Sequence, residues 1–215
     1  MHIKRHTIPK SWPVPRKGVP YVVKPNFEFE RGMPLLVVLR DVLKVAGTAK
    51  EIQHIVNERG ILVNTKPVKD VKHGVLLFDT ITFVKTKKSY RMEMDELGKF
   101  EFKEIKENES NKKISKVVNK TLLKGKKVQI NMSDGRNILS NEKCKTNDSA
   151  LINLNTGKIE KILPLKEKAE VLIFEGKHAG EKGAVISIDD KKKMVDIQLG
   201  KEKTSILIKQ VIVTA

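Results

Sequence analysis

The sequence has little of what several classes of protein depend on. Its single cysteine, Cys144, cannot close an internal disulfide, so the fold needs no oxidising compartment. One cysteine also excludes cysteine-based zinc sites, and the five histidines are scattered without the spacing of a ligand set. No apolar run approaches the roughly 20 residues that cross a bilayer, and the charged N-terminus lacks the apolar core of a signal peptide. We therefore expect a cytoplasmic protein without a metal, a cofactor or a membrane segment.

Acidic residues are too few to balance the basic ones. The 215 residues include 43 Lys and Arg against 26 Asp and Glu, which gives a formal net charge of +17. A charge of this size indicates a polyanionic partner. An anionic membrane is the competing partner, but no helical pattern sets a Trp, Phe and Leu face against a lysine face. Nucleic acid is therefore favoured.

Residues 1–25 contain no acidic side chain. Five prolines interrupt this segment, and prolines at that density oppose both helix and central strand. We therefore predict an extended basic arm over residues 1–32. Trp12 and Tyr21 lie within it, and two alternatives stay open with equal weight: they stack on bases, or they pack into the body of the protein.

Residues 33–83 carry consistent helix signals. Pro34 stands at a first helical position, apolar residues recur behind it at helical spacing, and Gly47 predicts a left-handed stop. Thr48 and Glu51 then form a capping-box signature, so a second helix should begin there.

A short buried strand at residues 61–63, a turn at residues 64–67 and an apolar run at residues 75–83 complete this helix-turn-helix-strand pattern. Several basic side chains fall outside its apolar faces and could converge into a cationic surface. An ordinary solvated face is the alternative for any one of them. They are Arg40, Lys44, Lys50, Lys66, Lys69 and Lys72.

The second half of the chain favours small β units. We predict a linker or loop at residues 101–119, where charged residues dominate without clear periodicity. From residue 122 onward the apolar period is two, with a tight hairpin turn at residues 133–135. Short strands with turns at close spacing, continuing through residues 166–215, indicate a small barrel or sandwich.

A glycine-rich loop in the last module does not fit a nucleotide-binding site. Gly176, Gly180 and Gly183 fail the spacing of both common phosphate-loop motifs, and a strand follows them instead of a helix. Glycines in such a loop permit a turn or a close backbone approach, with basic side chains placed around it.

Several segments, in order along the whole chain, resemble one family. They are HIKRH at residues 2–6, PKSWP at 9–13, PRK at 15–17, PLLVVLRD at 34–41, VN at 63–64 followed by KD at 69–70, DGRNIL at 134–139 and FEGKHAGEKGAV at 174–185. Together they closely resemble the archaeal and eukaryotic small-subunit ribosomal protein family S4e, and the last segment is similar to a KOW motif.

The resemblance implies an α+β multidomain protein. The implied parts are an extended basic N-terminal arm at residues 1–32, an S4-type RNA-binding domain of two helices on a small sheet at 33–92, a central small β domain at 93–165, and a KOW-type SH3-like β barrel at 166–215. Asn64-Thr-Lys stands where this RNA-binding domain often has Asn or Asp followed by Gly, which bears on the turn geometry. The short C-terminus favours an archaeal member.

We therefore predict a structural protein of the small ribosomal subunit, without catalytic residues or a small-molecule substrate, that supports subunit assembly and translation. Its partners would be ribosomal RNA of the small subunit and neighbouring ribosomal proteins. The expected RNA-binding residues are Lys4, Arg5, Lys10, Trp12, Arg16, Lys17, Arg40, Lys44, Lys50, Lys66, Lys69, Lys72, Arg136, Lys177, His178 and Lys182, with the KOW loop glycines Gly176, Gly180 and Gly183. A transient KOW-containing RNA-binding factor is one alternative. An RNA-modifying enzyme is another, although Asp134, Asp148 and Asp196 are isolated.

Overall fold

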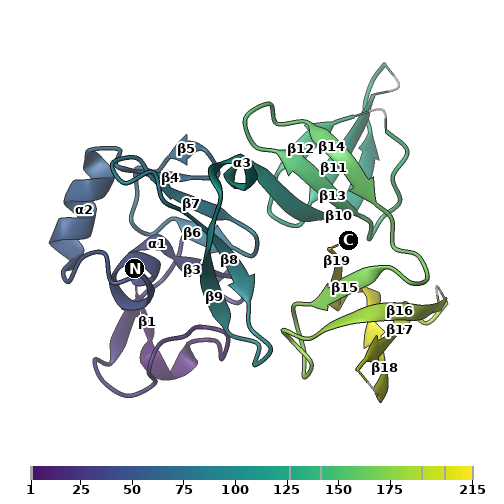
Figure 1. The fold of residues 1–215 in the computed structure, drawn as a ribbon, viewed down its shortest axis with the longest axis horizontal. Helices are drawn as coiled ribbons and strands as arrows, with labels where there is room; N and C mark the ends of the chain where they lie inside the picture. The colour runs from purple at the N-terminus through teal and green to yellow at the C-terminus, as the bar shows by residue number, and fades with distance from the viewer. Residues whose placement is uncertain (1, 126, 141, 190, 201, 215) are drawn as a thin grey trace. The chain divides into compact units, whose positions relative to one another are not determined.

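The chain folds into two compact units. The computed structural model describes residues 2–125, 127–140, 142–189, 191–200 and 202–214. One unit comprises Met1–Met94 and Lys99–Asn111, and the other comprises Asp95–Gly98 and Lys112–Ala215. Figure 1 shows that strands dominate both units and that the longest helix, α2, belongs to the first. This agrees with the predicted α+β class. Within the described ranges, no helix has both the length and the apolar character needed to span a membrane.

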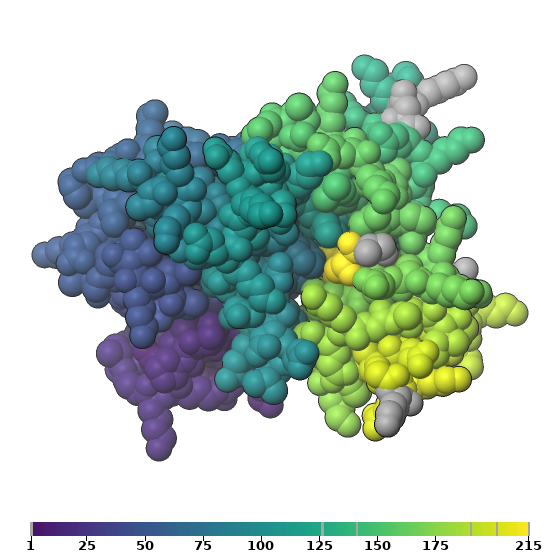
Figure 2. Space-filling view, viewed as in Figure 1, coloured from purple at the N-terminus to yellow at the C-terminus, as the bar shows by residue number. Residues whose placement is uncertain are grey.

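The N-terminal segment is folded, and the extended arm predicted for it is wrong. β1 (His2–Lys4) pairs antiparallel with β2 (Tyr21–Val23), and a 3-10 turn, η1 (Arg5–Thr7), begins the connection between them. Trp12 and Val22 are buried, so packing of apolar side chains outweighs the mutual repulsion of the basic ones. In the space-filling view of Figure 2 this purple segment is a compact block.

The first predicted helix is shorter and less regular than its sequence pattern suggests. β3 (Gly32–Pro34) leads into α1 (Leu35–Val37), which continues as a π-helical turn, η2 (Val38–Val42). Lys44 has a φ of 51°, so the left-handed residue that ends this helix is Lys44 and not the predicted Gly47. Buried apolar side chains fill both α1 and the start of η2, which places this turn in the core of the unit.

The second predicted helix is confirmed as α2 (Ala49–Asn57). The Thr48 hydroxyl accepts a hydrogen bond from the Glu51 amide at 3.3 Å, and the Glu51 carboxylate accepts from the Thr48 amide at 3.4 Å. This reciprocal pair satisfies two main-chain donors that the start of a helix otherwise leaves unpaired. Ile52 and Val56 are the buried face of the helix.

A five-stranded antiparallel sheet completes the first unit. Its order is β5-β4-β7-β8-β9, and β3 pairs separately with β6 (Gly74–Leu76). The apolar run predicted at residues 75–83 is therefore divided between two sheets. The strands of the larger sheet are β4 (Ile61–Val63), β5 (Lys66–Pro67), β7 (Thr80–Phe83), β8 (Ser89–Met94) and β9 (Phe100–Ile105).

The loop predicted at residues 101–119 is also wrong. This stretch contains most of β9, the short helix α3 (Glu107–Ser110) and much of β10 (Lys112–Leu122). Its charged side chains pair with neighbouring strands, as Lys103 does with Glu93 at 3.3 Å. Cross-strand ion pairs stabilise such strands without an apolar alternation that a single sequence would reveal.

The second unit holds two five-stranded antiparallel sheets, with orders β12-β11-β10-β13-β14 and β18-β17-β16-β15-β19. The predicted hairpin turn at residues 133–135 is confirmed between β11 and β12. The strands are β11 (Val128–Met132), β12 (Asn137–Leu139), β13 (Ser149–Asn153), β14 (Ile159–Leu163), β15 (Glu170–Ile173), β16 (Lys182–Asp189), β17 (Met194–Leu199), β18 (Glu202–Leu207) and β19 (Val211–Val213), with a 3-10 turn, η3 (Ile208–Gln210), before the last.

A buried lysine links the two sheets of this unit. Lys116 on β10 donates from Nζ to the main-chain oxygens of Ile208 at 2.5 Å and Val211 at 2.7 Å. One apolar cluster is centred on Ile130 and Ile152, and the other contains buried residues of β15 to β19 with Leu163 at the end of β14. The ammonium group thus donates to carbonyls at the start of η3 and at the start of the last strand.

Candidate nucleic-acid interface

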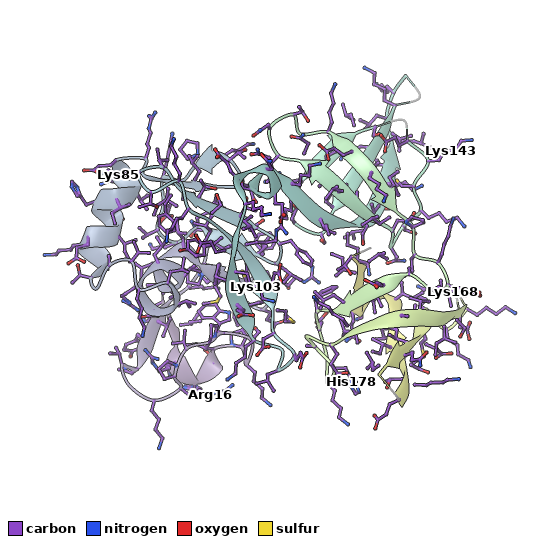
Figure 3. The ribbon with its side chains drawn as sticks, viewed as in Figure 1. Arg16, Lys85, Lys103, Lys143, Lys168 and His178 are labelled. Carbon is purple, nitrogen blue, oxygen red and sulfur yellow. The ribbon has the colours of Figure 1, made fainter. Side chains whose placement is uncertain are left out.

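Some basic side chains in the first unit form ion pairs with carboxylates, and others do not. On the β8–β9 ribbon they face carboxylates: Lys103 Nζ lies 3.3 Å from Glu93, and Arg91 lies 3.9 Å from Glu109. Figure 3 labels Lys103 on this ribbon. Such ion pairs lower the net positive charge of the surface, so less of that charge is available to bind an anionic partner.

The basic side chains of residues 2–25 have no such compensation from any residue that the structure describes. Lys4, Lys10, Arg16 and Lys17 are exposed, and none forms an ion pair with any residue that the structure describes. Arg16 is labelled in Figure 3 on the loop that joins β1 to β2. This segment therefore presents uncompensated positive charge to solvent.

An open depression lies within this segment. Arg5 closes one side, because its Nε donates to the Val19 oxygen and its Nη1 to the Pro15 oxygen, each at 2.5 Å. Arg5 was predicted as an RNA contact, and it also holds the loop in place. The lining residues are Lys4, Arg5, His6, Arg16, Lys17, Gly18, Pro20 and Tyr21.

Trp12 packs into the protein, which decides between its two predicted alternatives. The side chain is 3% exposed, and its Nε1 donates to the Phe29 oxygen at 3.2 Å. A ring in this position cannot stack on a base. Tyr21, in contrast, lies at the surface, where the residue is 52% exposed.

Arg40 is not a free cation, contrary to the prediction that it faces RNA. Its Nε and Nη2 each donate to one carboxylate oxygen of Asp41 at 2.9 Å. This hydrogen bonding raises the pKa of Arg40 above its ordinary value. The bidentate contact uses the geometry with which a guanidinium would bind phosphate, so Arg40 is poorly suited to that role.

The other predicted cations of residues 33–92 are available to solvent. Lys44, Lys50, Lys66 and Lys69 are exposed, and Lys72 is half-buried. In the ranges that the structure covers, none of the five has an ion-pair partner. They lie on the end of the first helix, the first turn of α2 and the turns around β5.

The two-residue turn before Lys66 has the backbone conformation of a glycine-containing hairpin turn, although neither of its central residues is glycine. Asn64 and Thr65 both have positive φ, 51° and 66°, and β4 pairs Val63 with Lys66 across them. Positive φ at both central residues is the type I′ hairpin turn, which favours Asn and Gly. A β-branched residue at this φ is strained, so surrounding contacts must hold the turn.

Those contacts form a buried polar network that sequence analysis missed. The Asn64 side-chain amide donates to Asp79 Oδ1 at 2.7 Å, and its oxygen accepts from the Thr80 amide at 3.2 Å. The other oxygen of Asp79 accepts from the Leu76 amide at 2.7 Å. These partners are up to 16 residues apart in sequence, so no local pattern reveals them.

Arg136 also belongs to a structural network. Lys113 on β10 and Asp134 in the β11–β12 turn form a buried ion pair at 2.8 Å, and Arg136 Nε lies 3.6 Å from the same carboxylate. Burial acts to raise the pKa of Asp134, but the charge and hydrogen bond of Lys113, together with the amide hydrogen bond and the charge of Arg136, outweigh it and hold that pKa below its ordinary value. Arg136, predicted as an RNA contact, thus already has a partner.

The glycine-rich loop between β15 and β16 uses backbone conformations and close approaches that favour glycine. Gly176 and Gly180 have φ values of 103° and 96°, and a Cβ on Gly183 would lie 2.4 Å from the Gln198 oxygen. These glycines therefore serve the turn and the close approach of β17. His178 pairs with Glu181 through Nδ1 at 3.2 Å, and Figure 3 labels it on this loop. Lys177 and Lys182 are exposed.

The described residues offer no metal centre. None of the His, Cys, Asp and Glu side chains that can be placed gather in threes or more around a possible ion. Cys144 is a buried free thiol in the core beside Ile130, and burial raises its pKa. It packs as a small apolar side chain.

Comparisons with known proteins identify the family. The family described as "Ribosomal family S4e" matches residues 86–159. The small ribosomal subunit protein eS4 of Methanocella arvoryzae is 40% identical over 190 residues, covering 87% of this chain and 80% of the relative. The same-named protein of Archaeoglobus fulgidus is 41% identical over 189 residues, covering 87% and 80%.

A solved structure agrees in fold. The crystal structure of the 30S ribosomal protein S4e from Thermoplasma acidophilum superposes with a TM-score of 0.74 and covers 86% of this chain and 95% of that one. Its sequence identity is 23%, so this likeness bears on the fold alone. The sequence relatives carry the assignment, and the chain belongs to the ribosomal protein family S4e.

Proposed function

We propose that this protein is a structural constituent of the small ribosomal subunit that binds ribosomal RNA in the cytoplasm and supports subunit assembly and translation. The archaeal relatives named above are small ribosomal subunit proteins. Membership of this family makes the chain a ribosomal protein and not an enzyme. The observation that carries RNA binding is the uncompensated positive charge of residues 2–25 and of the turns around α2 and β5.

We assign RNA-binding parts within this fold. Residues 33–92 would be the S4-type RNA-binding domain, which the two helices beside a small sheet support. Residues 93–165 would be the central β domain and residues 166–215 the KOW domain, supported by the glycine turns of the loop between β15 and β16. Residues 1–32 would be a folded basic segment.

The proposed contacts are the predicted cations that are exposed or half-buried and have no ion-pair partner among the described residues. Phosphate contacts of this kind position a protein without reading sequence, so specificity comes from the shape of the RNA. The residues with structural partners or burial, Arg40, Trp12, Arg136 and His178, fall outside this set. The contacts are Lys4, Arg5, Lys10, Arg16, Lys17, Lys44, Lys50, Lys66, Lys69, Lys72, Lys177 and Lys182.

A salt titration of binding to small-subunit ribosomal RNA tests the electrostatic part. If about six phosphates are neutralised, log affinity falls with log salt at a slope of roughly −4 to −5. Lys50→Ala should make the slope shallower by about 0.7 to 0.9. Lys103→Ala is the matched control, because that lysine is already paired with Glu93, and it should leave the slope unchanged. A flat slope for the unmodified protein would contradict phosphate binding.

Co-sedimentation tests residence on the ribosome. A structural constituent stays with small subunits through a moderate salt wash, because many phosphate contacts must break together. A transient KOW-containing factor leaves in the same wash. Release of most of the protein would therefore favour the transient role.

A further inference from the structure

We propose that the depression between β1, β2 and the loop at residues 15–20 binds one unpaired RNA nucleotide. A phosphate would lie against the basic lining, and the neighbouring base would stack on Tyr21. This inference rests on the proposed function, since it assumes an RNA partner, and it adds a specific site and a preference for single-stranded RNA.

The lining gives the depression its charge. Lys4, Arg5, Arg16 and Lys17 supply four permanent positive charges, and His6 is a fifth basic group. No acidic side chain is among the lining residues. Like charges held around one depression repel each other, and an anion in their midst relieves that repulsion. A phosphate with several oxygen acceptors suits such a set of donors.

Arg5 is already in position before any ligand binds. Its two hydrogen bonds to the main chain of the loop occupy two of the five guanidinium N–H groups, and its own amide donates to the Pro20 oxygen at 2.8 Å. Gly18 lies over the guanidinium: its φ is 124°, and a Cβ there would approach Arg5 Cζ to 3.9 Å. A cation fixed in this way loses little freedom when a phosphate arrives.

Strand pairing places an aromatic ring beside these charges. Tyr21 is directly opposite Lys4 across β1 and β2, so the two side chains share a face of the ribbon. His2 is on the same face and meets the Tyr21 ring edge to face at a centroid distance of 4.5 Å. Tyr21 is 52% exposed, which leaves ring surface for a base.

The combination selects single-stranded RNA. A base can stack on a side chain only when it is out of the duplex stack, whereas a duplex offers phosphates, 2′-hydroxyls and base edges but no open base face. A purely electrostatic surface needs no exposed ring. Tyr21 next to Lys4 therefore points to an unpaired nucleotide and not to the backbone of a helix.

The test compares two probes on the full-length protein: a fluorescent oligouridylate of about six nucleotides and an RNA duplex of about 16 base pairs. Stacking on an aromatic side chain contributes about 1–3 kcal/mol per base, which is about 5- to 150-fold in affinity. Tyr21→Leu should therefore weaken oligouridylate binding by at least about 5-fold and leave duplex binding unchanged. Tyr21→Phe keeps the ring and should bind both probes like the unmodified protein.

Two further variants separate charge from folding. Arg16→Ala with Lys17→Ala should weaken oligouridylate binding more than Lys124→Ala, which removes an exposed lysine of the other unit. Thermal unfolding of every variant checks that the fold is retained. A 4-thiouridine in the probe should crosslink to the peptide that contains Tyr21.

The outcomes distinguish the site from the proposed function. Equal oligouridylate binding by Tyr21→Leu and the unmodified protein overturns the stacking site, even if ribosomal RNA still binds with a steep salt slope. Failure of the unmodified protein to bind any ribosomal RNA overturns the proposed function instead. A crosslink confined to other peptides also overturns the site.

Discussion

Removing the buried ammonium of Lys113 should strongly destabilise the second unit. Lys113 Nζ lies 2.8 Å from Asp134 Oδ2, and the two side chains are only 2% and 5% exposed. Breaking such a pair costs about 3–5 kcal/mol, because the remaining charge stays buried without its partner. Arg136 still approaches the carboxylate at 3.6 Å, so we expect Lys113→Met to lie at the lower end, about 3 kcal/mol.

Urea unfolding of the full chain measures this loss. The matched control is Lys112→Met on the preceding residue, whose ammonium is 47% exposed and pairs with Glu160 at 2.8 Å. A surface pair of that kind contributes about 0–1 kcal/mol. Comparable small losses for both variants would refute the view that burial makes the Lys113 pair strong.

A double-mutant cycle isolates the pair itself. Asp134→Asn leaves a buried ammonium, whereas Lys113→Met combined with Asp134→Asn leaves neither charge. The double variant should therefore lose less stability than the two single losses added together. Strict additivity would show that the two groups act independently.

The pH dependence has a defined sign. The pKa of Asp134 is lowered in the folded protein, because Lys113 and Arg136 together outweigh the effect of burial. Its contribution is then fully present above the unfolded value of about 3.9 and is lost as the pH falls through the lower folded value. The unmodified protein should lose more stability below about pH 4 than Asp134→Asn does, as unfolding at several pH values would show.

Three further changes test other parts of the fold. Lys116→Met removes the donor for two carbonyls of the last module and should cost about 1–3 kcal/mol, seen as faster amide exchange in that module. Gly183→Ala should lower the thermal midpoint, because its methyl group would meet the Gln198 oxygen at 2.4 Å, whereas Gly47→Ala has open space and should not. Thr48→Ala should cost about 1 kcal/mol of unfolding free energy by urea titration, through loss of the helix cap.

Features set by neighbouring residues were predictable from the sequence. The capping box at Thr48 needs only a partner three residues away, and the turns with Gly176 and Gly180 need only a backbone that tolerates positive φ. The end of the first helix was misplaced because Lys44 takes the left-handed conformation that glycine usually provides. Local preference favoured Gly47, but the packing of the preceding turn decided the end.

Features set by distant partners were not predictable. Phe100 donates its amide to the Ser11 oxygen at 2.7 Å, which pairs the N-terminal segment with the start of β9. Nothing near Ser11 in sequence indicates this contact, so proline spacing alone suggested an extended arm. The same reason hid the burial of Lys113, whose carboxylate partner is 21 residues away.

Net charge predicted the kind of partner but could not rank individual side chains. Arg40 and Lys44 are one helical turn apart and look alike in the sequence, yet Asp41 neutralises the first and no described residue neutralises the second. The Asp41 carboxylate offsets the charge of Arg40 and takes two of its N–H donors, whereas a phosphate meets the whole charge of Lys44. Which lysines and arginines remain without a carboxylate after folding therefore determines where RNA can bind.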